Sequence, residues 1–212
     1  MHMNLYQSGG MIILAYLMGS ISTGYLMGWL IRGIDIRQYG SGRTGGSNAL
    51  RTLGPAGAAI TAAGDVGKSA AAVALAQWLG FPPVVVALAA LAAVLGHNYP
   101  VYLRFQGGAG VAPTIGALLI INFWMGLALV ALAALLVAIT RYSSAGALLL
   151  VNLTPFVMAA LAAENMLPWA YLILGVTVAV LVTWSLRPNI ARLLAGTERK
   201  LGEGGQKISA NS

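Results

Sequence analysis

The stretch "VAPTIGALLIINFWMGLALVALAALLVAI", residues 111 to 139, decides how many times this chain crosses a membrane. Its 29 residues include no charged side chain. A full membrane span needs about 20 residues. The stretch is therefore either one long helix or two short helices that turn near Asn122. The two alternatives place the segments after residue 139 on opposite sides of the bilayer.

The basic residues choose between the alternatives, because Lys and Arg of short loops favour the cytoplasmic side of a membrane. With a single helix, Arg141 and the basic C-terminal tail would lie across the membrane from the earlier arginines. With two helices, one side receives no Lys or Arg, and the other side receives Arg32, Arg37, Arg43, Arg51, Arg104, Arg141, Arg187, Arg192, Arg199, Lys200 and Lys207. The charges thus predict an all-α integral membrane protein, a bundle of seven transmembrane helices with the N-terminus outside and the C-terminus in the cytoplasm.

The apolar runs place these helices at about residues 10–32, 55–79, 83–96, 111–121, 123–140, 145–163 and 168–186 of a single transmembrane domain, residues 1–212. The composition agrees, since 58% of the residues are hydrophobic and only 8% are charged, against about 25% charged in soluble domains. The net charge of +7 is explained by cytoplasmic loops, so we expect no nucleic-acid partner. The absence of cysteine excludes disulfides and thiolate chemistry.

The first polar cluster is "RQYGSGRTGGSNALR", residues 37 to 51. Glycines let backbone N–H groups approach a ligand, and successive N–H groups in turns form anion-binding nests. Ser41, Ser47 and Asn48 add polar side chains, and Arg43 and Arg51 add charge. The cluster favours a phosphate or carboxylate site over its alternative, a flexible loop whose arginines only set the topology.

The second cluster is "GHNYPVYLRFQGGAGVAP", residues 96 to 113. Here "GGAG" opens a helix whose first N–H groups could point at an anion. His97 stands at the end of the preceding helix, where a C-cap is the simpler interpretation. A glycine-rich helix start beside it makes a functional role equally plausible.

Two further polar features accompany these clusters. Asp65 and Lys68 lie inside an expected span at i, i+3 spacing, which puts them on one helix face. They form either a buried ion pair that fixes packing or a pair in which Asp65 orients Lys68 toward a polar site. The tail "SLRPNIARLLAGTERK", residues 185 to 200, is typical of a short amphipathic helix on the inner membrane surface.

Together the clusters predict an anion site at the cytoplasmic face, open to soluble phosphates from one side and to lipid chains from the bilayer. This geometry suits an enzyme that joins a water-soluble phosphate to a fatty chain. A transporter of a small phosphorylated anion remains an alternative, although its site would lie near the midplane and often within repeats, and no internal repeat is evident. A pure scaffold would not need the glycine loops.

The chain resembles the bacterial acyl-phosphate:glycerol-3-phosphate acyltransferases, the PlsY family. The resemblance rests on four blocks in order: "GSGRTGGSNALR", "GDVGKSA", "GHNYPVYLRFQGGAGVAP" and "RPNIARLLAGTERKLG". It implies a multi-pass protein of a bacterial plasma (inner) membrane that works in phospholipid synthesis with its active site facing the cytoplasm. A fatty acyl phosphate would acylate sn-glycerol-3-phosphate, giving lysophosphatidic acid and phosphate, with no metal and no cofactor. The oligomeric state stays open.

The resemblance also assigns residues to the site. As catalytic residues it implies His97, Ser41 and Asn189. As substrate- or phosphate-binding residues it implies Gly42, Arg43, Gly45, Ser47, Asn48, Arg51, Asp65, Lys68, Gly107, Gly108 and Gly110.

The chain departs from the family pattern at several positions. The second loop of the family has a lysine where this chain has Ala109, and the first has an asparagine where this chain has Arg43. Because an arginine fork binds phosphate well, Arg43 is a candidate replacement for the lost charge. Smaller departures occur at Ser47, Ser69, Pro113, Ala147 and Leu186. A paralogue with altered or lost activity is the alternative interpretation of these changes.

Overall fold

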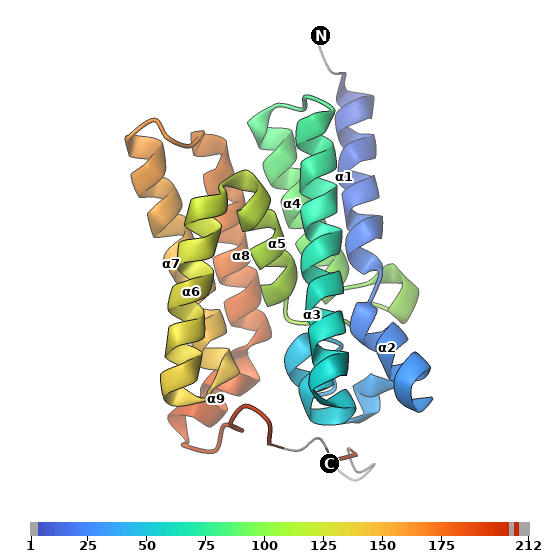
Figure 1. Cartoon of the computed structure of the whole chain (residues 1–212). Coiled ribbons are helices and arrows are strands. Elements are labelled where there is room, and N and C mark those ends of the chain that lie inside the picture. Colours follow the sequence, from blue (N-terminus) through green and yellow to red (C-terminus); the bar gives the residue numbers. More distant parts are fainter. Residues whose placement is uncertain (1–3, 204–205, 208–212) are drawn as a thin grey trace.

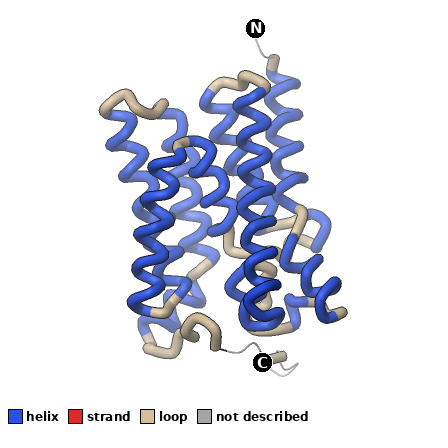
Figure 2. Tube along the Cα trace, in the orientation of Figure 1, coloured by secondary structure: helices blue, strands red, loops and turns tan. Residues whose placement is uncertain are grey.

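The computed structural model describes residues 4–203 and 206–207, and these residues form a bundle of roughly aligned helices (Figures 1 and 2). The α-helices are α1 Leu5–Ser20, α2 Thr23–Arg32, α3 Gly46–Trp78, α4 Pro83–Asn98, α5 Val111–Ile121, α6 Phe123–Thr140, α7 Ser143–Ala163, α8 Leu172–Ser185 and α9 Arg187–Leu194. Short 3-10 turns cover Ile36–Gln38 (η1), Val101–Leu103 (η2) and Trp169–Tyr171 (η3).

The deciding stretch forms two helices, α5 and α6, as the basic residues predicted. Asn122 lies between them in an extended conformation, and its side chain accepts a hydrogen bond from the Met125 N–H. This contact satisfies one of the N–H groups that a helix start leaves without a partner. The helix α6 ends at Thr140, because the next residue, Arg141, has a φ of +64° that stops the helical path.

The first helix differs from the prediction of one helix over 10–32. It begins earlier, at Leu5, where Asn4 and Gln7 form a reciprocal capping box. It also breaks at Ile21 and Ser22, so that α1 and α2 are separate helices. The break leaves backbone groups to be satisfied by residues elsewhere in the chain.

The helix α3 begins at Gly46, nine residues before the predicted start at residue 55. Gly54 (φ +82°) has a non-helical conformation just before Pro55, so the helix is kinked there. The first turns of α3 therefore carry Ser47, Asn48 and Arg51, which the sequence placed in a loop.

Length and hydropathy together single out four segments that could cross a membrane: Leu5–Arg32, Pro83–Leu103, Phe123–Thr140 and Ser143–Ala163. The pair Trp169–Ser185 and Arg187–Leu194, bent by 62°, is a fifth candidate. The helix α5 is apolar but short. The described chain is thus an all-helical protein with four to five clear candidate spans.

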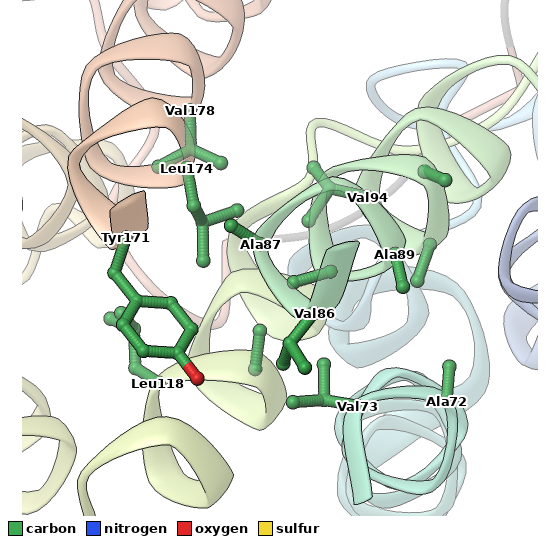
Figure 3. Close-up of a cluster of buried hydrophobic side chains, with 14 of the residues drawn as sticks. Ala72, Val73, Val86, Ala87, Ala89, Val94, Leu118, Tyr171, Leu174 and Val178 are labelled. Atoms are coloured by element: carbon green, nitrogen blue, oxygen red, sulfur yellow. The ribbon is translucent and has the colours of Figure 1, made fainter. Parts of the chain in front are cut away.

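The core lies where α4 packs against α1, α3 and α8. Figure 3 shows valines, alanines and leucines from α3, α4, α5 and α8 meeting in one cluster, with the ring of Tyr171 beside them. Close helix approach depends on small residues. A Cβ atom on Gly19 would overlap the backbone of Ala93, and one on Gly96 would overlap that of Tyr16.

Candidate active site

The glycine-rich loop between α2 and α3 is held in shape by Asn48. Its Oδ1 accepts the Ser41 N–H at 3.0 Å. Its Nδ2 contacts the carbonyl oxygens of Ile36 (3.1 Å), Tyr39 (3.0 Å) and Arg43 (2.8 Å). Asn48 is 2% exposed, so it organises the loop from inside. Gly42, at φ +72°, closes a turn by donating its N–H to the Tyr39 carbonyl.

A cavity of about 470 Å³ opens beside this loop. Its walls come from the start of α3, the end of α4, the starts of α5 and α7, and the α8–α9 junction. The apolar part of the wall includes Ala58, Ala59, Ala62 and Ile115. Nine predicted site residues line the cavity: Ser41, Arg43, Gly45, Ser47, Asn48, Arg51, His97, Gly110 and Asn189.

A second, more polar cavity of about 330 Å³ adjoins the first. The two share Ser41, Arg43, Arg51 and Asn189. The second cavity adds basic side chains from the C-terminal segment, namely Arg192, Arg199 and Lys207. The arginines of the first loop thus stand between an apolar chamber and a cationic one.

Arg43 occupies the boundary between the cavities, and its guanidinium donates to the Ser185 carbonyl oxygen. Burial lowers the pKa of Arg43, and the positive charges of Arg192 and Arg187 lower it further. Because the ordinary arginine pKa lies far above neutrality, Arg43 remains a cation. Its charge is unfavourably placed among like charges, which an anionic ligand would relieve.

His97 closes one wall of the cavity from the end of α4, and the glycines of the second loop pack against it. Gly107 donates its N–H to the Asn98 carbonyl, and Gly108 donates to that of His97. A Cβ on Gly108 would overlap Nε2 of the His97 ring. The N–H groups of Gly107 and Gly108 are therefore used within the loop in this structure, and an anion-binding role for these two glycines stays a prediction. Gly110, by contrast, lines the cavity at the start of α5.

Asp65 and Lys68 do not line either cavity. They form an ion pair of 2.8 Å behind His97, with side chains that are 1% and 8% exposed. Lys68 Nζ lies 3.1 Å from His97 Nδ1. The pair reaches the cavity only through the histidine, so its placement as a direct phosphate-binding pair is not supported by the geometry.

Sequence reasoning overlooked Glu198. This carboxylate follows α9 and is 7% exposed. It accepts hydrogen bonds from Ser144 (2.8 Å), Asn189 (2.7 Å) and Arg192 (2.7 Å). Burial raises its pKa, but these hydrogen bonds outweigh burial and the pKa is lowered overall. One of only two acids in the basic tail was the available signal, and Glu198 ties Asn189, a predicted catalytic residue, to the start of α7.

The fold and the site define a helical membrane protein whose cavity suits an anionic ligand with an apolar part. Comparison with known proteins makes the class specific. The family model for glycerol-3-phosphate acyltransferases matches residues 9–196, and the chain belongs to this family.

Relatives match along nearly their whole length. Glycerol-3-phosphate acyltransferase 2 of Moorella thermoacetica is 44% identical over 91% of this chain and 96% of its own. The glycerol-3-phosphate acyltransferase of Shouchella clausii is 42% identical over 91% and 95%. Crystal structures of PlsY (YgiH), an integral membrane glycerol 3-phosphate acyltransferase, match in two forms. The glycerol 3-phosphate form gives a TM-score of 0.83 at 30% identity over 92% of this chain and 96% of that one. The lysophosphatidic acid form gives 0.81 at 29% identity over 91% and 94%.

Proposed function

We propose that this protein transfers a fatty acyl group from acyl phosphate to sn-glycerol-3-phosphate, giving lysophosphatidic acid and inorganic phosphate. The observation that carries the proposal is the pair of joined cavities. One has alanine and isoleucine walls, the other is lined by basic side chains, and both include Arg43 and Arg51. An acyl phosphate needs both environments at once, an apolar wall for its chain and cations for its phosphate.

The reaction needs little covalent chemistry from the protein, because an acyl phosphate carries a good leaving group. The glycerol hydroxyl oxygen forms a bond to the acyl carbonyl carbon, and the bond from that carbon to the phosphate oxygen breaks. The hydroxyl proton leaves either through His97 or with the phosphate. Arg43 and Arg51 neutralise the phosphates, while Ser41 and the first turn of α5 add hydrogen-bond donors.

The proposal is tested by supplying purified protein with palmitoyl phosphate and labelled glycerol-3-phosphate, and by following lysophosphatidic acid. Palmitoyl-CoA is the contrasting donor. We expect product from palmitoyl phosphate only. Folded protein that forms no product from either donor would contradict the proposal and favour a paralogue without this activity. Movement of unchanged labelled substrate into liposomes would identify a transporter instead.

We further propose seven membrane spans in the plasma membrane of a bacterium, with the N-terminus outside and the cavities open to the cytoplasm. Tryptophans favour the two interfaces of a membrane with water. The exposed tryptophans of this chain lie at two opposite ends of the helices, which supports a bundle that spans a membrane. Trp29 and Trp184 stand at the helix ends near the cavities, and Trp78, Trp124 and Trp169 stand at the opposite ends.

The orientation can be tested with single cysteines, because the chain has none of its own. Phe123→Cys, at the exposed start of α6, and Asn165→Cys, after α7, should react with an impermeant maleimide from outside the cell. Arg104→Cys should react only from the cytoplasm. Labelling of the first two sites from the cytoplasm alone would refute the seven-span arrangement.

A further inference from the structure

A buried polar cluster lies directly behind the candidate active site, where three segments meet. Asp65 and Lys68 come from α3, His97 from the end of α4, and Ile21 from the break between α1 and α2. The side chains of Asp65, Lys68 and His97 are 1%, 8% and 3% exposed. No other Asp, Glu, Lys, Arg or His side chain in the described residues forms an ion pair with this group.

Lys68 makes three polar contacts in this cluster. Its Nζ lies 2.7 Å from the Ile21 carbonyl oxygen, 2.8 Å from Asp65 Oδ1 and 3.1 Å from His97 Nδ1. A lysine ammonium has three N–H donors and no acceptor. The contacts with Ile21 and His97 have hydrogen-bond geometry, whereas Asp65 is held by charge as an ion pair. Because the ammonium can only donate, the His97 nitrogen must accept in its contact with Lys68. His97 can accept at Nδ1 only if that nitrogen carries no proton.

We infer that Lys68 fixes His97 as the tautomer with its proton on Nε2, so that the histidine offers the cavity a hydrogen-bond donor and not a base. A neutral imidazole carries its single N–H on one nitrogen, and the bond made by the other nitrogen selects which. Because Nδ1 accepts from Lys68, the proton lies on Nε2.

The opposite edge of the ring is the one that meets the loop and the cavity. His97 lines the larger cavity, while its Nδ1 edge faces Lys68 and Asp65. The side of the ring bearing Nε2 lies against Gly108, where any side chain would overlap it. Glycine at this position keeps Nε2 uncovered. The N–H of Nε2 has no acceptor among the described residues, so it is available to a ligand.

Asp65 is the competing partner that makes the tautomer depend on Lys68. Its Oδ1 lies 3.4 Å from His97 Nδ1. After a small shift this oxygen could accept a hydrogen bond from Nδ1 if that nitrogen carried the proton. With Lys68 present, Asp65 is paired at the shorter distance of 2.8 Å. Without Lys68, the carboxylate would favour the tautomer with its proton on Nδ1. The Nε2 atom at the cavity would then carry no proton.

This inference rests on the proposed function for its mechanistic meaning. An Nε2–H donor can stabilise negative charge that develops on the acyl carbonyl or phosphate oxygens. It cannot take the glycerol proton at that nitrogen, so the proton must go to another acceptor. Lys68 and Asp65 are then positioning residues that act through His97 and do not touch the substrate.

The tautomer can be read directly by ¹⁵N NMR of histidine-labelled protein in nanodiscs at neutral pH. The chain has only two histidines, so His2→Gln leaves a single signal pair from His97. We expect a pyridine-type shift at Nδ1 and a pyrrole-type shift with an attached proton at Nε2. A proton on Nδ1, or on both nitrogens, would overturn the inference. This measurement needs no turnover, so its failure is distinct from failure of the proposed activity.

Two variants test whether Lys68 sets the tautomer of His97. Lys68→Met removes the donors while keeping an unbranched side chain of similar length, and we expect the proton to move to Nδ1. Asp65→Asn removes the competing carboxylate, and the Nε2–H signal should persist. If the proposed activity holds, Lys68→Met should lower kcat about 10²–10³-fold, the loss typical of removing one such donor. An Nε2–H signal that survives Lys68→Met would show that Lys68 does not set the tautomer. The wild-type spectrum decides the main point even if this variant does not fold.

Discussion

Replacing Arg43 tests whether this chain has exchanged one phosphate-binding cation for another. Arg43 and Ala109 line the same cavity from opposite loops. The Arg43 guanidinium uses one nitrogen on the Ser185 carbonyl oxygen, which leaves further N–H groups of its five for a ligand. Arg43→Ala would remove this charge from the boundary of both cavities.

The size of the effect follows from the contact that is lost. A hydrogen bond to a charged group contributes about 1.5–3 kcal/mol, which corresponds to roughly one to two decades in an equilibrium constant. Burial and the neighbouring charge of Arg192 lower the pKa of Arg43, so a phosphate there would also relieve repulsion. We expect Arg43→Ala to raise the KM for glycerol-3-phosphate or acyl phosphate by about 10- to 100-fold.

The assay compares both substrates in the acyltransfer reaction, with a rescue variant and a matched control. Adding Ala109→Lys to Arg43→Ala should recover much of the loss, because the charge returns from the facing loop. Adding Ala109→Lys to Arg51→Ala should not, because Arg51 lies one helical turn into α3 and its Nε is buried without a partner. Unchanged kinetics in an active Arg43→Ala enzyme would refute the reasoning and leave Arg43 as a topology charge.

Three other changes should separate the roles in the site. Gly108→Ala should strongly reduce kcat by displacing His97, whereas Gly67→Ala, with open space around it, should leave activity intact in the same assay. Asn48→Ala should lower the thermal unfolding midpoint and increase proteolysis of residues 36–45, because each buried carbonyl left unpaired costs about 1–3 kcal/mol; an unaltered midpoint would contradict this. Because the pKa of Glu198 is lowered in the folded state, its stabilisation is present above the ordinary glutamate pKa and is lost as pH falls through the lowered value. Glu198→Gln should therefore flatten the acid limb of a stability–pH curve, and an unchanged curve would argue against a structural role.

The path of the chain through α5 and α6 could be predicted because its signals are individual residues that can be recognised in the sequence without knowing the tertiary contacts. Asn122 is a polar residue with capping ability in an apolar run, and the basic Arg141 that follows the run favoured two helices over one. The break between α1 and α2 could not be predicted in the same way. The group that accompanies it, Lys68, lies 47 residues away in the sequence, and only the folded bundle brings it to the Ile21 carbonyl.

The sequence predicted most of the residues that line the cavity, but it did not predict which contacts hold some of them in place. Glycines at 107 and 108 indicated a special backbone, and the sequence favoured anion binding as the reason. The structure gives another reason, since the close approach of His97 leaves no room for a side chain at either position. Asn48 likewise proved to be a loop-forming residue. A motif shows that a small or polar residue is needed, but the partner that requires it is set by tertiary contacts.

The few acids of the chain explain which cations remain for a substrate. Asp35 pairs with Arg37, Asp65 with Lys68, and Glu198 with Arg192, at distances of 2.7–2.8 Å. Arg43 and Arg51 line both cavities. Neither has a carboxylate within ion-pair distance among the described residues. Both are partly buried, where an unpaired charge is unfavourable. An anion that enters the cavity would supply the counter-charge that these two partly buried arginines lack.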